Sequence, residues 1–326
     1  MTIGNDVNQI EISSLSKIRG QGRVTDLLKV NLDAHFQSRQ TNSKPAAFGP
    51  VLLCGPSGTG KTLVAKALHA ELGNIHLIET NGEMLASPNE LICILLSANE
   101  HTTIFIDECQ GMNSRSQHIL LTALSEGVLY LPGRYKSKGD KTIPLEPFTL
   151  LMATTHEYYL QNALRNRIRI YCRFEHYRLE DLVDIIRQRA SALKWAVESE
   201  QVLVEIANRS KKTPRIALNR NLQQCWYVCS AKGKNIIGME DVNEAFKLLQ
   251  IDELGLDELE RRYLRILQEN GPTALNVISS KLALPGQTIK TVLEPFFLQE
   301  GLIQKNKCSL REITVLGDEH IRNCTI

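Results

Sequence analysis

The segment from Gly55 to Thr62 constrains the fold of this chain more than any other part of the sequence. It reads Gly-Pro-Ser-Gly-Thr-Gly-Lys-Thr and matches the G-x-x-x-x-G-K-[ST] spacing of a phosphate-binding P-loop. A short apolar run precedes it at 51–54, and good helix formers follow it at 63–68. This position between a buried strand and a helix separates a P-loop from an ordinary glycine-rich turn. The pattern therefore predicts nucleotide binding.

The chemistry of a bound triphosphate assigns roles within this loop. The backbone N–H groups of a glycine-rich loop and of a helix N-terminus attract phosphate oxygens. We expect Lys61 to reach the β- and γ-phosphates and Thr62 to ligate Mg2+. The loop residues predicted to bind the nucleotide are Gly55, Pro56, Ser57, Gly58, Thr59, Gly60, Lys61 and Thr62. ATP and Mg2+ are the expected cofactors.

A pair of carboxylates follows the P-loop at the end of an apolar run. Residues 102–106 read Thr-Thr-Ile-Phe-Ile and lead into Asp107 and Glu108. An acidic pair at a strand end can be a solvated turn or a helix cap. Downstream of a P-loop, however, the first carboxylate holds the Mg2+ hydration shell and the second polarises the attacking water. We therefore expect Asp107 to serve the metal and Glu108 to be catalytic.

The first half of the chain alternates strand-like and helix-like runs, which predicts a mixed α/β fold with a parallel sheet covered on both faces. The expected strands are 49–54, 76–80, 102–108, 148–155 and 168–174. Sites in such sheets lie where the strands end. The P-loop and both carboxylates should therefore converge on one edge.

From about residue 178 the pattern is helical only, which predicts a four-helix lid over 178–252 after an ATPase domain with an N-terminal arm over 1–177. Residues 253–326 read as three helices and two short strands, the pattern of a winged helix. Its third helix, 288–299, is the expected recognition helix. The candidate DNA-binding residues are Lys290, Lys305, Lys307 and Arg311. A protein-docking or packing role for this domain is the alternative.

Composition narrows the class of protein. A formal net charge of +2 over 326 residues gives no overall polyelectrolyte character, so nucleic-acid contact would depend on local patches. No apolar run is long enough to span a membrane, and the N-terminus has no secretory signal, so a cytoplasmic location is expected. The eight cysteines favour reduced thiols over a disulfide framework. Cys225 and Cys229 have helical spacing that could share a metal, but buried thiols are the favoured reading.

Several motifs in one order make the sequence resemble an AAA+ ATPase, and more narrowly the RuvB family of hexameric Holliday-junction branch-migration motors. The most specific are the residues around Asp107-Glu108, Ala153-Thr154-Thr155, Leu164-Arg165-Asn166-Arg167, Thr213-Pro214-Arg215 and Asp252-Glu253-Leu254-Gly255-Leu256-Asp257. The resemblance extends from about residue 18 to residue 320. It implies ATP hydrolysis in a ring of subunits that moves duplex or Holliday-junction DNA in recombination and repair.

The same resemblance implies roles for single residues. Thr155 matches the sensor-1 position and Arg215 matches sensor 2, both of which act on the bound nucleotide. Arg167 matches the arginine finger that enters the neighbouring subunit's site, although Arg165 and Arg169 are close enough in sequence to compete for that role. Gly20 and Gln21 match the segment that frames the adenine.

The chain departs from the family in the parts that face partners. The segment 131–145 reads as a projecting hairpin and corresponds to the RuvB element that docks RuvA, the junction-binding partner. The tip is apolar in RuvB but charged here, with Arg134, Lys136, Lys138, Asp140 and Lys141. A charged tip does not suit an apolar groove, so docking of RuvA itself is in question. The alternative function is an AAA+ protein remodeller, loader or regulatory ATPase that docks a protein through the hairpin and winged helix.

Overall fold

The computed structural model describes residues 6–10, 12–41, 47–131 and 141–324. The chain forms two compact units. One comprises residues 11–177, and the other combines residues 1–10 with 178–326. The first is a parallel α/β P-loop domain, and the second contains the helical lid and the winged helix, so the expected fold class is confirmed.

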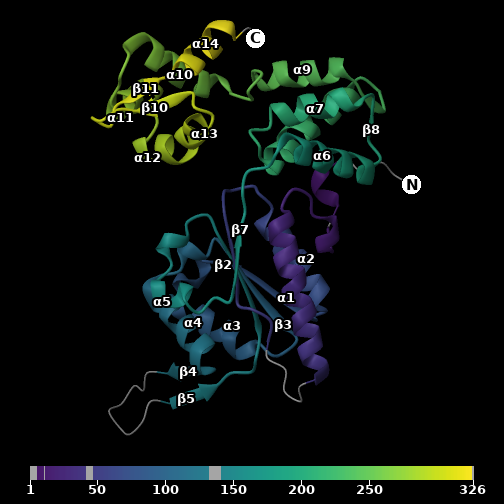
Figure 1. Ribbon diagram of the computed structural model, residues 1–326, viewed down its shortest axis with the longest axis vertical. Coiled ribbons are helices and arrows are strands. Elements are labelled where there is room, and N and C mark those ends of the chain that lie inside the picture. Colours follow the sequence, from purple (N-terminus) through teal and green to yellow (C-terminus); the bar gives the residue numbers. More distant parts are fainter. Residues whose placement is uncertain (1–5, 11, 42–46, 132–140, 325–326) are drawn as a thin grey trace. The chain divides into compact units, whose positions relative to one another are not determined.

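A five-stranded parallel sheet forms the centre of the α/β domain (Figure 1). Its strands lie in the order β2-β3-β6-β1-β7, with β1 between β6 and β7. The strands are β1 (Val51–Cys54), β2 (His76–Asn81), β3 (Thr102–Asp107), β6 (Thr149–Thr154) and β7 (Ile170–Arg173). The five expected strands are all present, and β7 is shorter than expected.

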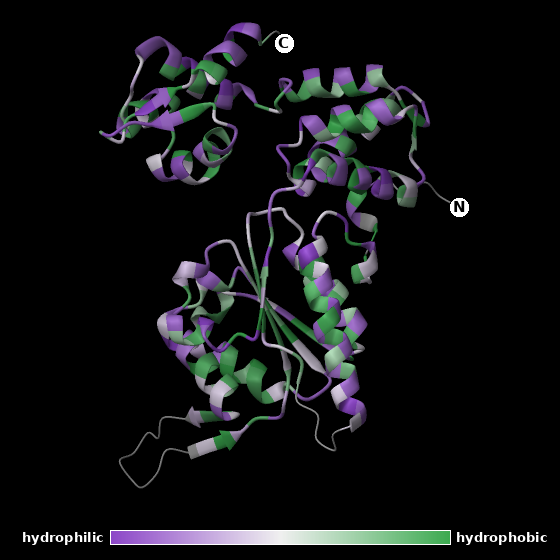
Figure 2. Cartoon of the chain, in the orientation of Figure 1, coloured by the Kyte–Doolittle hydropathy of each residue, from purple (hydrophilic) through white to green (hydrophobic). Residues whose placement is uncertain are grey.

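Helices cover both faces of this sheet because each strand presents successive side chains to opposite sides. Val51 and Leu53 of β1 pack under α1 and α2, whereas Leu52 and Cys54 pack under α3 and α4. Figure 2 shows hydrophobic strands between helices that carry both hydrophobic and hydrophilic residues. The helices are α1 (Gly22–Thr41), α2 (Lys61–Leu72), α3 (Pro88–Ser97), α4 (Ser114–Glu126) and the short α5 (Asn162–Arg165).

The predicted hairpin is present as an antiparallel pair, β4 (Val128–Leu131) and β5 (Lys141–Pro144). Leu129 pairs with Ile143 in this ladder. Its tip, with Arg134, Lys136, Lys138 and Asp140, lies outside the described residues.

The lid contains α6 (Leu179–Leu193), α7 (Glu200–Asn208), the π-helical segment η6 (Ile216–Leu222) that continues into α8 (Gln223–Ala231), and α9 (Met239–Leu249). A two-stranded parallel pair, β8 (Ala196–Val197) and β9 (Ile236–Ile237), was not predicted. Trp195 and Trp226 stack at 4.7 Å between ring centroids in the lid interior.

Residues 6–10 of the N-terminal arm belong to the same compact unit as the lid, although we expected the whole arm to belong to the ATPase domain. Leu15, also in the arm, packs in the core of the α/β domain as expected. The Val7 amide donates to Gln223 Oε1 at 2.8 Å, and the Arg189 guanidinium donates to the Ile10 carbonyl at 2.8 Å. Val7 is buried. The sequence did not reveal this division of the arm, because its isolated apolar positions give no periodic signal.

The winged helix consists of α10 (Glu258–Asn270), α11 (Leu275–Leu282), a third helical segment and the ribbon β10 (Ile303–Lys305) with β11 (Arg311–Ile313). The third segment runs through α12 (Gly286–Thr288), the π-helical η7 (Ile289–Leu293) and α13 (Glu294–Gln299). A further helix, α14 (Val315–Asn323), was not predicted.

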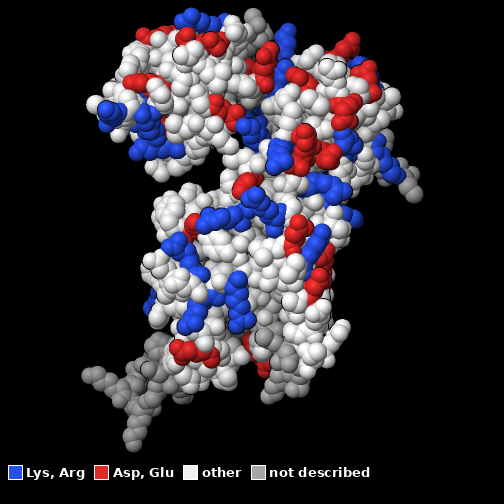
Figure 3. All heavy atoms as spheres, in the orientation of Figure 1, with Lys and Arg blue, Asp and Glu red and all other residues white. Residues whose placement is uncertain are grey.

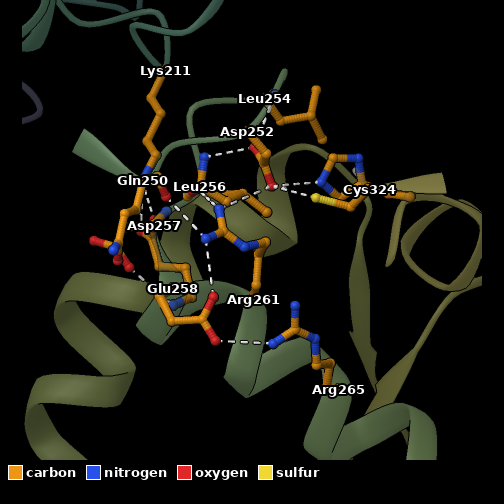
Figure 4. Close-up of polar contacts among 12 residues, drawn as sticks. Lys211, Gln250, Asp252, Leu254, Leu256, Asp257, Glu258, Arg261, Arg265 and Cys324 are labelled. Carbon is orange, nitrogen blue, oxygen red and sulfur yellow. Dashed lines mark hydrogen bonds and ion pairs between the residues drawn. The ribbon is translucent and has the colours of Figure 1, made fainter. Parts of the chain in front are cut away.

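A buried charge network surrounds the segment that joins the lid to the winged helix (Figure 4). Asp252 Oδ1 accepts the Leu254 and Leu256 amides at 3.0 and 2.8 Å, and Asp252 Oδ2 contacts His320 Nε2 at 3.0 Å. The fully buried Arg261 guanidinium donates to the Gln250 carbonyl at 2.9 Å and to Glu258 at 3.0 Å. Asp252 thereby provides a hydrogen-bond acceptor inside the fold for the backbone amides of Leu254 and Leu256.

Within the ranges that the structure describes, none of the helices combines the length and apolar composition needed to cross a bilayer.

Candidate active site

The P-loop connects the end of β1 to the start of α2, as the sequence predicts. Gly55 lies where a side chain cannot fit: an added Cβ would be 2.5 Å from the Phe174 carbonyl oxygen. Its φ of 151° is also unfavourable for other residues. The first glycine of the motif is therefore required by the close approach of the segment that follows β7.

Three side chains, those of Thr59, Tyr177 and Lys61, donate hydrogen bonds to the backbone of the loop. The Thr59 hydroxyl donates to the Pro56 carbonyl at 2.8 Å, and the Thr59 carbonyl accepts from the Tyr177 hydroxyl at 2.8 Å. Lys61 is 6% exposed, and its ammonium donates to the Gly55 and Pro56 carbonyls at 2.8 Å each. The lysine is thus held against the loop that is expected to take phosphate.

The residues expected to serve the metal lie together. The Thr62 hydroxyl at the start of α2 donates to Asp107 Oδ2 at the end of β3, at 2.8 Å. A hydroxyl and a carboxylate are the hard oxygen ligands that Mg2+ prefers. This pair therefore fits a magnesium ion beside the P-loop.

Glu108 and Thr155 also converge at this edge of the sheet. The Thr155 hydroxyl donates to Glu108 Oε2 at 3.1 Å and lies 2.9 Å from His156 Nδ1. Gln110 contacts both Glu108 and Thr155 through its amide nitrogen. The structure thus brings together the P-loop, both carboxylates and the sensor threonine, as expected for strand C-termini in a parallel sheet.

The adenine-framing residues lie at the start of α1. Gln21 is buried, and its side-chain amide donates to the Glu175 carbonyl at 2.9 Å. Gly20 directly precedes it with a φ of 74°. Arg215 belongs to the lid, where it is exposed and directly precedes η6.

The two candidate finger arginines differ in their surroundings. Arg165 is half-buried and bonded to Asn162 within α5. Arg167 is exposed and makes no ion pair among the described residues. It lines an open groove of about 420 Å³ with His118 of α4 and Asn166.

The candidate DNA-binding residues separate into two pairs. Lys290 and Lys307 are exposed, and neither forms an ion pair with a described residue. By contrast, Arg311 is 6% exposed and donates to Glu294 at 2.7 Å, and Lys305 lies 2.9 Å from the same buried carboxylate. We therefore no longer expect Arg311 to contact DNA, because its charge is used inside the domain.

Figure 3 shows Lys and Arg side chains gathered on the winged-helix domain around the β10–β11 ribbon, although one of its wing cations, Lys305, is paired internally.

The described cysteines are free thiols. Burial and the neighbouring Glu157 raise the pKa of Cys54, at the end of β1, to about 12, so this thiol stays protonated beside the P-loop. Cys225 and Cys229 are buried and do not belong to a group of potential metal ligands among the described residues.

Sequence reasoning missed Gln110 and Tyr177. Gln110 is a single polar residue two positions after Glu108, and this proximity was the only available signal. Tyr177 is separated from Thr59 by more than a hundred residues, so no local pattern links them.

The fold and the site define the class: this chain is a P-loop ATPase of the AAA+ type, with a helical lid and a winged helix. Family sequence models match in the same order. The RuvB P-loop domain of the Holliday junction DNA helicase matches residues 10–174, the RuvB AAA lid domain matches 177–252, and the RuvB C-terminal winged helix domain matches 253–322. The chain belongs to the RuvB family.

Individual relatives agree with the family models. The RuvB subunit of the Holliday junction branch migration complex from Lactobacillus johnsonii is 31% identical over 295 residues, covering 89% of this chain and 84% of the relative. The Holliday junction branch migration motor RuvB of Thermotoga maritima is 28% identical, with a TM-score of 0.79 over 96% of this chain and 98% of the other. A substituted form of that protein is also 28% identical and superposes with a TM-score of 0.81, covering 96% and 99%.

Proposed function

We propose that this chain is an ATP-driven motor that moves duplex or Holliday-junction DNA in recombination and repair. The observation that carries the proposal is the convergence of Thr62, Asp107, Glu108 and Thr155 beside the P-loop. Three consecutive RuvB-type domains support the coupling of that site to DNA.

In the proposed site, the loop amides and Lys61 bind the triphosphate and orient its γ-phosphoryl group. Thr62 and Asp107 would hold Mg2+, which neutralises charge on the phosphate oxygens. Glu108 accepts a proton from the attacking water, and Thr155 orients that water near the γ-phosphate. Gly20 and Gln21 frame the adenine, and Arg215 acts on the nucleotide from the lid.

We further propose that subunits assemble into a ring, as a hexamer, and that Arg167 is the finger supplied to the neighbouring site. Its exposure and its lack of a described ion pair leave its guanidinium available, whereas Arg165 is tied to Asn162. A finger supplied in trans stabilises the negative charge of the transition state, and this stabilisation raises the rate of hydrolysis by several orders of magnitude. Hydrolysis then depends on assembly.

DNA contact is proposed through Lys290 on the third helix and Lys307 in the wing, both exposed. Each would neutralise a phosphate, which gives sequence-independent and salt-sensitive binding. This suits a motor that must move along any sequence.

One observation favours a second candidate function, a protein remodeller or loader. Glu294 neutralises Arg311 and Lys305, so the wing has less charge for DNA than the sequence suggests. In that case the winged helix and hairpin 131–145 dock a protein. The charged hairpin sequence argues for a partner other than RuvA under either function.

We also propose a cytoplasmic location, because the eight cysteines are free thiols and thiols stay reduced in that compartment.

An ATPase assay with and without four-way junction DNA tests the proposal. We expect turnover to rise with junction or duplex DNA and the rise to shrink as salt is added. Turnover that ignores every form of DNA contradicts the motor and favours the protein remodeller.

A further inference from the structure

Gln110 makes three side-chain hydrogen bonds at the edge of the ATP site. It lies on the turn η4 (Cys109–Gly111), directly after Glu108. Its amide nitrogen donates to Glu108 Oε2 at 2.5 Å and to the Thr155 hydroxyl at 3.2 Å. Its amide oxygen accepts from the buried Thr154 hydroxyl at 2.5 Å. One side chain therefore ties the catalytic carboxylate to both threonines at the end of β6.

The turn that presents Gln110 is fixed by its backbone. Glu108 has a φ of 43° and a ψ of 49°, a left-handed conformation that is unfavourable for a residue other than glycine. Gly82 packs so closely that an added Cβ would lie 2.3 Å from the Glu108 carbonyl oxygen, and its amide donates to the Asp107 carbonyl at 2.9 Å. Such a strained position persists only where its surroundings hold it.

The hydrogen bonds of the Glu108 carboxylate are unevenly distributed. Oε2 accepts from both Gln110 and Thr155, whereas Oε1 makes no hydrogen bond or ion pair with a described residue. A glutamine amide is suited to this place because it offers a donor to the carboxylate and an acceptor to Thr154 at the same time. A hydrocarbon or carboxylate side chain of similar length cannot do both.

We propose that Gln110 is a positioning residue for ATP hydrolysis, which anchors one oxygen of Glu108 against Thr155 and leaves the other to accept the proton of the attacking water. The step balances: the water oxygen bonds to the γ-phosphorus, the bond from that phosphorus to the bridging oxygen breaks, and the water proton passes to Oε1. Gln110 takes no part in the proton transfer and acts only through the orientation of Glu108.

Two substitutions in the full-length chain separate positioning from a structural role. Gln110→Met keeps the approximate volume but removes every hydrogen bond. Gln110→Glu keeps the shape but sets a second carboxylate against Glu108. Gln37→Met is the matched control, because Gln37 is an exposed glutamine on α1. Turnover at saturating ATP, nucleotide affinity, thermal midpoint and the pH profile of kcat are measured for each.

For Gln110→Met we expect kcat to fall about 10- to 100-fold, with nucleotide affinity and the thermal midpoint close to those of the unsubstituted chain and of Gln37→Met. For Gln110→Glu we expect low activity at high pH that rises as the pH falls. Adjacent carboxylates raise the pKa of one of them, and the protonated side chain regains a donor. If Gln110 had a purely structural role, the activity of Gln110→Glu would not recover as the pH falls.

Three results would overturn the inference: unchanged or raised kcat in Gln110→Met, a loss of kcat that merely tracks a lower thermal midpoint, or a pH profile for Gln110→Glu that parallels Gln110→Met. The inference rests on the role proposed for Glu108, so Glu108→Gln is measured beside these variants. An active Glu108→Gln defeats that assignment, whereas an inactive Glu108→Gln with a fully active Gln110→Met defeats only the present inference.

Discussion

Glu108 lies directly after β3, and one oxygen of its carboxylate accepts a hydrogen bond from the Thr155 hydroxyl. The neighbouring Asp107 accepts a hydrogen bond from Thr62, at the start of the helix that follows the P-loop. The proposed mechanism gives binding and hydrolysis to different side chains. In it, the loop amides and Lys61 would bind the phosphates, Thr62 would hold the metal, and Glu108 would accept the proton of the attacking water. Single substitutions should therefore separate the two properties.

Glu108→Gln should bind ATP as tightly as the unsubstituted chain and lose hydrolysis by about 100-fold or more, because an amide cannot accept the water proton. Binding of a fluorescent ATP analogue and phosphate release measure the two properties. Glu126→Gln, an exposed position on α4, is the control. Normal turnover in Glu108→Gln would remove Glu108 from the mechanism.

The buried pair of Glu294 and Arg311 should make the winged helix sensitive to acid. Burial alone raises the pKa of Glu294, but hydrogen bonds and charge from Arg311 and Lys305 outweigh it and hold the pKa below its ordinary 4.5. A lowered folded pKa contributes stability above the unfolded pKa, and that contribution is lost as the pH falls through the folded pKa.

Glu294→Gln should therefore destabilise the chain at neutral pH, by about 3–5 kcal/mol for a broken buried pair, and the difference should shrink below about pH 4.5. Thermal unfolding at a series of pH values measures it, with the exposed Glu319→Gln as control. A difference that stays constant on acidification would show that Glu294 does not carry this charge interaction.

At the scale of elements, the periodicity of apolar residues predicted the strands and helices that depend on local sequence. The runs at 51–54 and 102–106 lie in the buried strands β1 and β3, and the helix expected over 257–269 is α10 (Glu258–Asn270). The strand order could not be predicted, because β1 pairs with β6 and β7 through residues that are 100 and 119 positions apart in the sequence. The burial of Arg311 could not be predicted from the sequence either, because its partner Glu294 lies on another element.

The wing and the third helix should contribute separately to DNA binding. Lys307→Ala and Lys290→Ala should each weaken binding to all sequences and lower the slope of log affinity against log salt by about 1, because each removes one phosphate contact. Fluorescence anisotropy at several salt concentrations measures the slope. Lys247→Ala, exposed on α9 of the lid, should leave it unchanged. Unchanged slopes for both lysines would favour the protein-docking role.

At the scale of the whole molecule, the proposed arginine finger, Arg167, would complete an ATP site shared by two subunits of the proposed ring. Arg167→Ala and Glu108→Gln should each be inactive alone, because one lacks the finger and the other lacks the base. Mixed rings contain interfaces in which an Arg167→Ala subunit supplies Glu108 and its neighbour supplies Arg167. Mixing should therefore restore part of the ATPase activity. Arg165→Ala is the control, and a mixture that stays inactive would contradict a finger supplied in trans.

Conversion of a synthetic four-way junction tests the account most directly, because it measures DNA movement rather than hydrolysis alone. With ATP and Mg2+, the chain should move the branch point until the junction separates into two duplexes. Arg167→Ala should leave the junction intact. A chain that hydrolyses ATP and binds the junction, yet leaves it intact, would contradict the proposed motor.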